Sequence, residues 1–341
     1  MGQAITIGMD IAKQVFQLHG ADEAGSVVFR KKITRAKVLV FFGSQPPCVV
    51  VMEACGGAHH WAREIVKLGH QVKLIAPKYV KPFVTRQKND MADAEAICEA
   101  AQRPTMRFVA VKSEAAQASG LVFRARDLLV RQRTQIINAL RGHLTEHGWV
   151  VAKGPAHVAK LIDHVDDPAC QLPQVARTIL KVMISSLKDL DAQIDLLDRE
   201  IGKRAKGDQI AQRLTSIPGV GPITATAISA LAPPVETFKR GRDFAAWVGL
   251  TPLQRSTGGK QKLGATSKMG ERTIRRRLII GASAVVRHAA RRAPDGSWLG
   301  RMLARKPRML VTVALANKMA RIVWALLTKG GVYKAPIVAA A

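Results

Sequence analysis

Short apolar runs rich in β-branched residues open the chain and predict a sheet. Residues 5–10 form a buried strand that ends in an acid, and two more β-rich runs follow at 15–20 and 26–30. Three such runs separated by turn residues favour an antiparallel meander. Helices and strands then alternate over residues 36–42, 48–53, 58–68 and 71–75. This order predicts an α/β domain with a mixed sheet flanked by helices.

Beyond residue 111 the pattern turns helical. One helix of nearly forty residues is expected from Ser113 to about Trp149, and a second follows a linker that contains proline and glycine. Apolar residues in the second helix recur at alternating spacings of three and four, as in a coiled-coil seam. The seam comprises Leu180, Met183, Leu187, Leu190, Ile194, Leu197 and Ile201. It either joins two copies of the protein or packs against the preceding helix, and we expect it to contribute to self-association.

The first long helix carries five arginines whose role the sequence leaves open. Either they reach phosphate groups or they form an ordinary solvated face. They are Arg124, Arg126, Arg131, Arg133 and Arg141.

A glycine-rich segment, residues 214–225 (LTSIPGVGPITA), resembles a helix-hairpin-helix. Gly219 and Gly221 permit a tight hairpin, and the N–H groups that begin the next helix can hold a DNA phosphate without reading sequence. A plain packing corner between two helices is the alternative.

Positive charge is concentrated in the last third of the chain. The formal net charge is +28, and residues 235–341 hold 22 Lys and Arg against 4 Asp and Glu, which accounts for +18. So large an excess implies a polyanionic partner, with nucleic acid the leading one. Besides the two hairpin glycines, the nucleic-acid contacts expected here are Lys260, Lys262, Lys268, Arg272, Arg275 and Arg276. Charge alone does not distinguish DNA from RNA.

The remaining composition favours a cytoplasmic protein. The four cysteines lack metal-ligand spacing and are expected to be reduced, and no secretory signal pattern opens the chain. The most apolar late segment, residues 310–327, contains Asn317, Lys318 and Arg321, which argues against a membrane span.

Four acids stand out because of where they fall in the predicted elements. Asp90 and Asp93 lie three apart on one face of an expected helix. Adjacent acids repel unless a cation holds them, although first-turn acids also complement a helix dipole. Asp10 and Glu53 end two predicted strands, and ligands bind at the carboxyl ends of strands in open sheets. The four carboxylates could therefore hold two Mg²⁺ ions about 4 Å apart, or Mn²⁺ in their place, for in-line phosphoryl displacement.

The segments around these acids resemble the Asp-Glu-Asp-Asp motifs of a RuvC-like domain, which has the RNase H fold. Their order and intervals are similar to those of the DEDD insertion-sequence transposases, a family of bridge-RNA-guided recombinases. The segments are residues 8–13 (GMDIAK), 52–57 (MEACGG) and 88–94 (KNDMADA). The resemblance implies an RNase H-like catalytic domain over residues 1–111, long coiled-coil helices for self-association over 112–207, and a mainly α-helical transposase domain over 208–341.

Further matching residues lie in the basic C-terminal third. By chemistry alone Ser256 is a turn residue in an expected flexible loop without an obvious general base. Residues 249–252 (GLTP), 256–260 (STGGK) and 268–270 (KMG), however, resemble the transposase-domain signature of the same family. That resemblance implies Ser256 as the nucleophile, with Thr257 as the alternative if the register differs by one. Glu271 departs from the expected Asn or Asp and puts a local contact in doubt.

The resemblance also implies a mechanism and partners. The four acids hold Mg²⁺ against the scissile phosphate, and Ser256 attacks that phosphate to give a phosphoserine–DNA intermediate. Composite active sites join domains of different protomers, in a dimer or in a synaptic tetramer. A structured non-coding RNA chooses donor and target DNA by base pairing. The resemblance also implies that the protein is bacterial and associates with the nucleoid when it is active.

Three other functions fit parts of the sequence. A RuvC-like endonuclease would hydrolyse junction DNA and leave Ser256 structural. A sugar-kinase or actin-like ATPase would also carry an Asp after its first strand, but it predicts a second glycine-rich phosphate loop and does not explain the basic third. A non-catalytic nucleic-acid scaffold would tolerate loss of Asp90.

Overall fold

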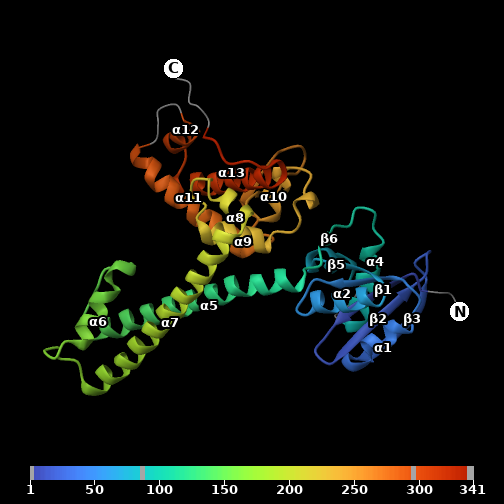
Figure 1. The fold of residues 1–341 in the computed structure, drawn as a ribbon, viewed down its shortest axis with the longest axis horizontal. Helices are drawn as coiled ribbons and strands as arrows, with labels where there is room; N and C mark the ends of the chain where they lie inside the picture. The colour runs from blue at the N-terminus through green and yellow to red at the C-terminus, as the bar shows by residue number, and fades with distance from the viewer. Residues whose placement is uncertain (1–3, 85–88, 293–296, 336–341) are drawn as a thin grey trace. The chain divides into compact units, whose positions relative to one another are not determined.

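The chain forms two compact units, residues 1–117 and 118–341, in the computed structural model (Figure 1). The structure describes residues 4–84, 89–292 and 297–335, so Lys88 of the third acidic motif lies outside the described residues. Each unit has apolar clusters of its own. The division into three domains stays a prediction.

A six-stranded mixed sheet forms the centre of the first unit, in the order β3-β2-β1-β4-β5-β6. Strand β1 (Thr6–Ile11) pairs antiparallel with β2 (Val15–Ala21), and β2 pairs antiparallel with β3 (Val27–Thr34). The predicted meander is therefore confirmed. On the other side of β1, β4 (Val49–Glu53) and β5 (Gln71–Ile75) run parallel to it.

Helices cover both faces of this sheet because side chains alternate along each strand. One face packs against α1 (Val38–Gly43) and α2 (Ala58–Lys67), which confirms both predicted helices. The other face uses Val51 and Ile75 to pack against α4 (Asp90–Ala101). The remaining short elements of this unit are η1 (Arg35–Lys37), α3 (Pro77–Val80), η2 (Lys81–Phe83) and β6 (Phe108–Val109).

Two long helices, α5 (Glu114–Glu146) and α7 (Gln174–Gly207), lie side by side along part of their length (Figure 1). With the short α6 (Val158–Asp166) they bury one apolar cluster. Its buried members are Leu140, Leu144, Leu161, Val165, Leu180, Ile184 and Leu187. Leu180 and Leu187 of the predicted seam are thus covered within the chain, as the intramolecular alternative requires, and a coiled coil between two copies stays a prediction.

Three of the five arginines on α5 contact the chain itself. Arg126 forms a bidentate ion pair with Asp198 of α7, and Arg133 lies 3.0 Å from an Asp191 carboxylate oxygen. Arg141 donates to backbone carbonyls in the linker after α5. These three side chains therefore bind groups of the chain itself. They neither wait free for a phosphate nor form an ordinary solvated face.

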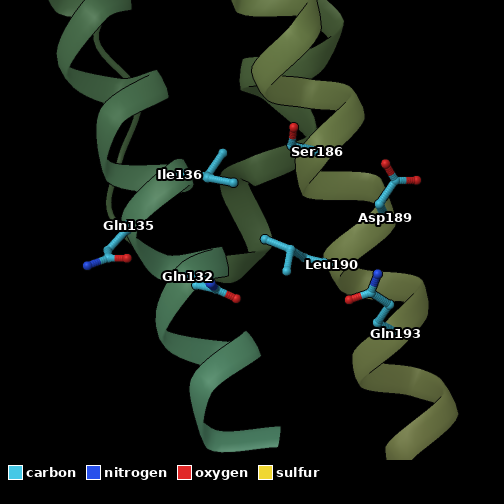
Figure 2. A pocket seen from close by; sticks show the side chains of 7 residues that line it. All are labelled: Gln132, Gln135, Ile136, Ser186, Asp189, Leu190 and Gln193. Carbon is cyan, nitrogen blue, oxygen red and sulfur yellow. The ribbon is translucent and has the colours of Figure 1, made fainter. Parts of the chain in front are cut away.

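An open groove separates α5 from α7 beyond that cluster (Figure 2). Its volume is about 400 Å³. The lining side chains are Gln132, Gln135, Ile136, Ser186, Asp189, Leu190 and Gln193. Leu190 of the predicted seam therefore lies in this groove, beside polar side chains of both helices.

The C-terminal part is mainly helical and has one large core. Its elements are α8 (Gln209–Leu214), α9 (Pro222–Leu231), η4 (Val235–Thr237), α10 (Gly241–Trp247), β7 (Pro252–Gln254), β8 (Leu263–Thr266), α11 (Arg272–Arg292), α12 (Trp298–Arg305) and α13 (Arg308–Lys329). Helix α13 is long and apolar enough to cross a membrane by length and composition alone. Its residues Ala316, Met319 and Val323 are buried in the core, which accounts for that composition.

Candidate functional site

Three of the predicted acids meet at one edge of the first unit. Asp10 lies near the end of β1, and Asp90 and Asp93 lie in the first turn of α4. One carboxylate oxygen from each can be chosen so that all three atoms lie within 4.8 Å of one another. Carboxylates repel at that separation unless a cation or protonation offsets the charge.

Local sequence explains why α4 begins where it does. The Asn89 side chain accepts a hydrogen bond from the Met91 N–H at 3.1 Å, which is the N-cap arrangement. The cap places Asp90 at the first helical residue and Asp93 one turn later. Both acids therefore complement the helix dipole as well as facing Asp10.

Gly8 allows α4 to lie directly against β1. A Cβ atom at this position would come within 2.3 Å of the Ala94 carbonyl oxygen and 2.8 Å of the Cys98 nitrogen. Any larger side chain would push the helix away from the strand. The glycine two residues before Asp10 is thus what lets the acids of α4 approach that of β1.

Glu53 joins the same edge from β4. Met9 of β1 pairs with Met52 of β4 in parallel register, so Asp10 and Glu53 come next along neighbouring strands. Burial raises the pKa of Glu53, and the negative charges of Asp10 and Asp93 raise it further. Glu53 thus lies in the electrostatic field of the other acids, although it is not one of the three carboxylates within 4.8 Å.

The donor set fits a hard divalent cation. Carboxylate oxygens are the ligands that Mg²⁺ and Mn²⁺ prefer. The nearby Cys55 thiol has a raised pKa, chiefly through burial and then through the charges of Glu53 and Asp10. A protonated thiol is a poor metal ligand, so the carboxylates are the donors that best fit a cation at this edge.

Ser256 lies on a β-hairpin, where the sequence predicted a flexible loop. Strands β7 and β8 pair antiparallel, and beyond them Thr257 and Lys260 exchange two backbone hydrogen bonds at 3.3 and 3.0 Å. Gly258 and Gly259 form the turn with φ of 54° and 73°, and a two-residue turn with both φ positive is the one that suits hairpin twist. The Ser256 hydroxyl oxygen accepts a hydrogen bond from the Lys262 N–H at 3.3 Å.

The six predicted basic contacts have different surroundings. Lys260, Lys262, Lys268 and Arg272 are exposed. Arg276 is also exposed and lies 3.7 Å from an Asp127 carboxylate oxygen. Arg275 is only partly exposed, and its Nη1 donates to two backbone carbonyl oxygens.

The two glycines of the predicted helix-hairpin-helix lie between α8 and α9. Gly219 has φ of 84° and contacts α11, because a Cβ on Gly281 would fall 1.9 Å from the Gly219 carbonyl oxygen. Gly221 is exposed at the start of α9. Backbone packing on α11 therefore explains Gly219, and phosphate binding by this turn stays a prediction.

The sequence interpretation missed a buried ion network. Arg277 of α11 lies 3.1 Å from an Asp127 carboxylate oxygen of α5, and both side chains are largely buried. Arg126 and Asp198 form an ion pair beside them. The basic run 275–277 gave no sign that one of its arginines points inward, because partners 150 residues away in the chain decide it.

Two family models match this chain, one for each part that carries a candidate site. Residues 7–148 match a DEDD IS110 model described as a transposase, and residues 211–295 match one described as the transposase IS116/IS110/IS902 family. A probable family 20 transposase of Pseudomonas aeruginosa is 49% identical over 96% of this chain and 98% of its own length.

Two further relatives are similar along nearly their whole length. The transposase for insertion sequence element IS1111A of Coxiella burnetii is 39% identical over 96% of this chain and 91% of that protein. The transposase for insertion sequence element IS1328 of Yersinia enterocolitica is 38% identical over 98% of this chain and 99% of that protein.

Proposed function

We propose that this chain, which belongs to the IS110/IS116 family of DEDD insertion-sequence transposases, cuts and rejoins DNA through a serine ester at a divalent-metal site. The observation that carries this proposal is the approach of Asp10, Asp90 and Asp93 to within 4.8 Å from two elements far apart in the sequence. Such a concentration of acids destabilises the fold unless it binds something positive.

Asp10, Glu53, Asp90 and Asp93 are the proposed ligands of Mg²⁺, with Mn²⁺ as a substitute. When bound, the ion supplies positive charge for the scissile phosphate and the leaving oxygen. The strand ends and the capped helix hold the carboxylates in place before DNA arrives, so the site needs little rearrangement on binding. An RNase H-like fold for this domain is part of the proposal and is supported by the mixed sheet with acids on adjacent strands.

Ser256 is the proposed nucleophile. Its Oγ forms a bond to phosphorus while the bond from phosphorus to a sugar oxygen breaks, and the hydroxyl proton passes in net terms to that leaving oxygen. The phosphoserine ester retains the phosphodiester energy, so a hydroxyl of another strand can displace Ser256 without ATP. Exposure of the hairpin and the charges of Arg255, Lys260 and Lys262 support contact with a phosphate.

Family membership supports further partners. We propose that donor and target DNA bind the basic C-terminal part, that a structured non-coding RNA guides their choice, and that the α8–α9 turn acts as a helix-hairpin-helix. We also propose self-association through α7, as a dimer or a synaptic tetramer with composite active sites. Besides the seam, α7 exposes Val175, Ile179 and Val182 by 73%, 56% and 64%, which leaves apolar surface for a second copy. The expected compartment is the bacterial cytoplasm.

One observation favours a second candidate, a RuvC-like junction endonuclease in which Ser256 is structural. Residues 252–266 contain no Asp, Glu or His that could act as a general base. The hydrogen bond from Lys262 to the Ser256 hydroxyl is also what a structural turn residue would make.

A trapping experiment separates the two candidates. A nicked duplex carrying the joined ends of the element is incubated with Mg²⁺, the transcript of the element's non-coding flank, and wild-type protein, Ser256→Ala or Thr257→Ala. We expect a covalent protein–DNA adduct with wild type and Thr257→Ala and none with Ser256→Ala, measured by denaturing gel electrophoresis. Full strand cleavage by Ser256→Ala without any adduct would support the endonuclease instead.

A further inference from the structure

Main-chain hydrogen bonds hold both the segment that enters the Ser256 hairpin and the segment that leaves it. Helix α10 ends at Trp247, and beyond it the Gly249 and Leu250 N–H groups donate back to the carbonyls of Ala246 and Ala245. On the returning side, the Ser267 and Lys268 N–H groups donate to Thr251 and Gly249 at 2.8 and 3.2 Å. Backbone pairing therefore continues from these two segments into β7 and β8, with a register shift between Pro252 and Gln254.

Arg275 of α11 joins the outgoing and returning segments. Its Nη1 donates to the Val248 carbonyl oxygen at 2.9 Å and to the Met269 carbonyl oxygen at 2.6 Å. One nitrogen thus bridges the residue that precedes the hairpin and the residue that follows it. Burial lowers the pKa of the Arg275 guanidinium, as expected for a cation that has exchanged water for protein carbonyls.

Two glycines make this crossing possible. A Cβ on Gly249 would fall 2.1 Å from the Met269 carbonyl oxygen, and a Cβ on Gly270 would fall 1.6 Å from the Trp247 carbonyl oxygen. Lys268 between them has φ of 54°, the left-handed region that side chains rarely adopt. The backbone is therefore forced into a close crossing, and the strain requires a compensating contact such as the Arg275 bridge.

A second helix supports the same crossing. The Asn317 side chain of α13 donates to the Leu250 carbonyl oxygen at 3.3 Å. A two-stranded ribbon has little stability of its own, so the orientation of its tip depends on what its base is attached to.

We propose that Arg275 is a positioning residue, which fixes the Ser256 hairpin to α10 and α11. Its place in a basic run suggested a phosphate contact, and we propose that it makes none. The inference deepens the proposed function, on which the role of Ser256 rests. Of the three arginines of α11 that were predicted to contact nucleic acid, Arg272 and Arg276 are exposed and keep that role.

Three measurements on Arg275→Ala test the assignment. Hydrogen exchange of amides 250–268 should speed up at least tenfold, with α9 as an internal reference. The adduct-forming rate at saturating DNA should fall about tenfold to a hundredfold, because small displacements of a nucleophile have large kinetic effects. Affinity for the same duplex, measured from low to high salt, should keep the wild-type slope of log affinity against log salt.

Two variants guard against simple misfolding. Asn317→Ala removes the second support without changing the charge. We expect hydrogen exchange in the hairpin to speed up about threefold and the adduct-forming rate to fall about threefold. Lys329→Ala removes one exposed charge at the far end of α13 and should change neither hydrogen exchange in the hairpin nor the adduct rate. Melting temperatures of all variants show whether the core stays folded.

A phosphate contact would give the opposite pattern. The salt slope would fall by about 0.9 for one lost contact, saturating DNA would restore the adduct rate, and hydrogen exchange in the hairpin would not change. That result would overturn the positioning role. If wild-type protein forms no adduct, the proposed function fails, and hydrogen exchange still decides the role of Arg275.

Discussion

The two candidate reactive groups are built on very different supports. The acids of the first unit lie on β1, β4 and the capped helix α4. Because Gly8 has no side chain, α4 packs directly against β1. Ser256 lies on an exposed two-stranded hairpin attached to the C-terminal core at its base. A charge site must be rigid, because carboxylates that could separate would relax their repulsion and bind metal weakly. A nucleophile that must reach a polymer is better placed on a projecting element with a stiff base.

The strongest test of the acidic site is the double variant Asp90→Asn, Asp93→Asn. We expect strand cleavage to fall by at least about a thousandfold, because the remaining acids cannot hold the cation that offsets phosphate charge. DNA binding should be unchanged or slightly tighter, since two negative charges are lost. Cleavage of a labelled duplex and a binding titration on the same preparation measure both.

Glu99→Gln is the matched control for that double variant. It lies on the same helix, is exposed, and pairs with Arg103 at 2.9 Å. It should cleave at the wild-type rate. Cleavage that survives in the double variant would refute a metal-binding role for the pair.

A second test compares the two supports through one kind of substitution. Gly8→Ala should lower the free energy of unfolding of the first unit by about 2–3 kcal/mol, because its new Cβ meets backbone atoms that cannot move aside. Gly259→Ala should cost about 1 kcal/mol, since it has φ of 73° but no atom within 4 Å of the added carbon. Urea unfolding followed by circular dichroism measures both, and equal losses would mean that the hairpin tip is packed as tightly as the sheet.

The smallest expected effect concerns Glu53. Its raised pKa means that the folded protein holds this proton more tightly than the unfolded chain does, so stability falls as pH rises above the ordinary value of 4.5. Glu53→Gln should therefore raise the melting temperature at pH 7 by about 2 °C without metal and give no gain near pH 4. Added Mg²⁺ should stabilise wild type more than the variant.

Glu64→Gln serves as the opposite case for that measurement. A hydrogen bond from Lys67 lowers the pKa of this partly exposed glutamate, so its replacement should not stabilise the protein at pH 7. A gain in both variants would point to net charge in general and not to repulsion within the acidic site.

Local patterns in the sequence were enough to predict the main strands and helices of the first unit and to single out its acids. Strands 5–10 and 71–75 follow from runs of β-branched residues, and the helix from Asp90 follows from an Ala-rich run with high helix propensity. These signals act between near neighbours in the chain. The acids at two strand ends could then converge, and the parallel pairing of β1 with β4 places Asp10 and Glu53 at one edge. The order of the motifs was sufficient to indicate the family that the comparisons established.

The tertiary structure decided what the basic and apolar side chains do. Arg275 and Arg276 are adjacent in the sequence, yet one bridges two carbonyls and the other is exposed near Asp127. Leu187 belongs to a seam that fits a partner chain or α5 equally well by periodicity, and packing within the chain covers it. Charge and hydrophobicity are properties of one residue, whereas their use depends on long-range neighbours that no local pattern specifies.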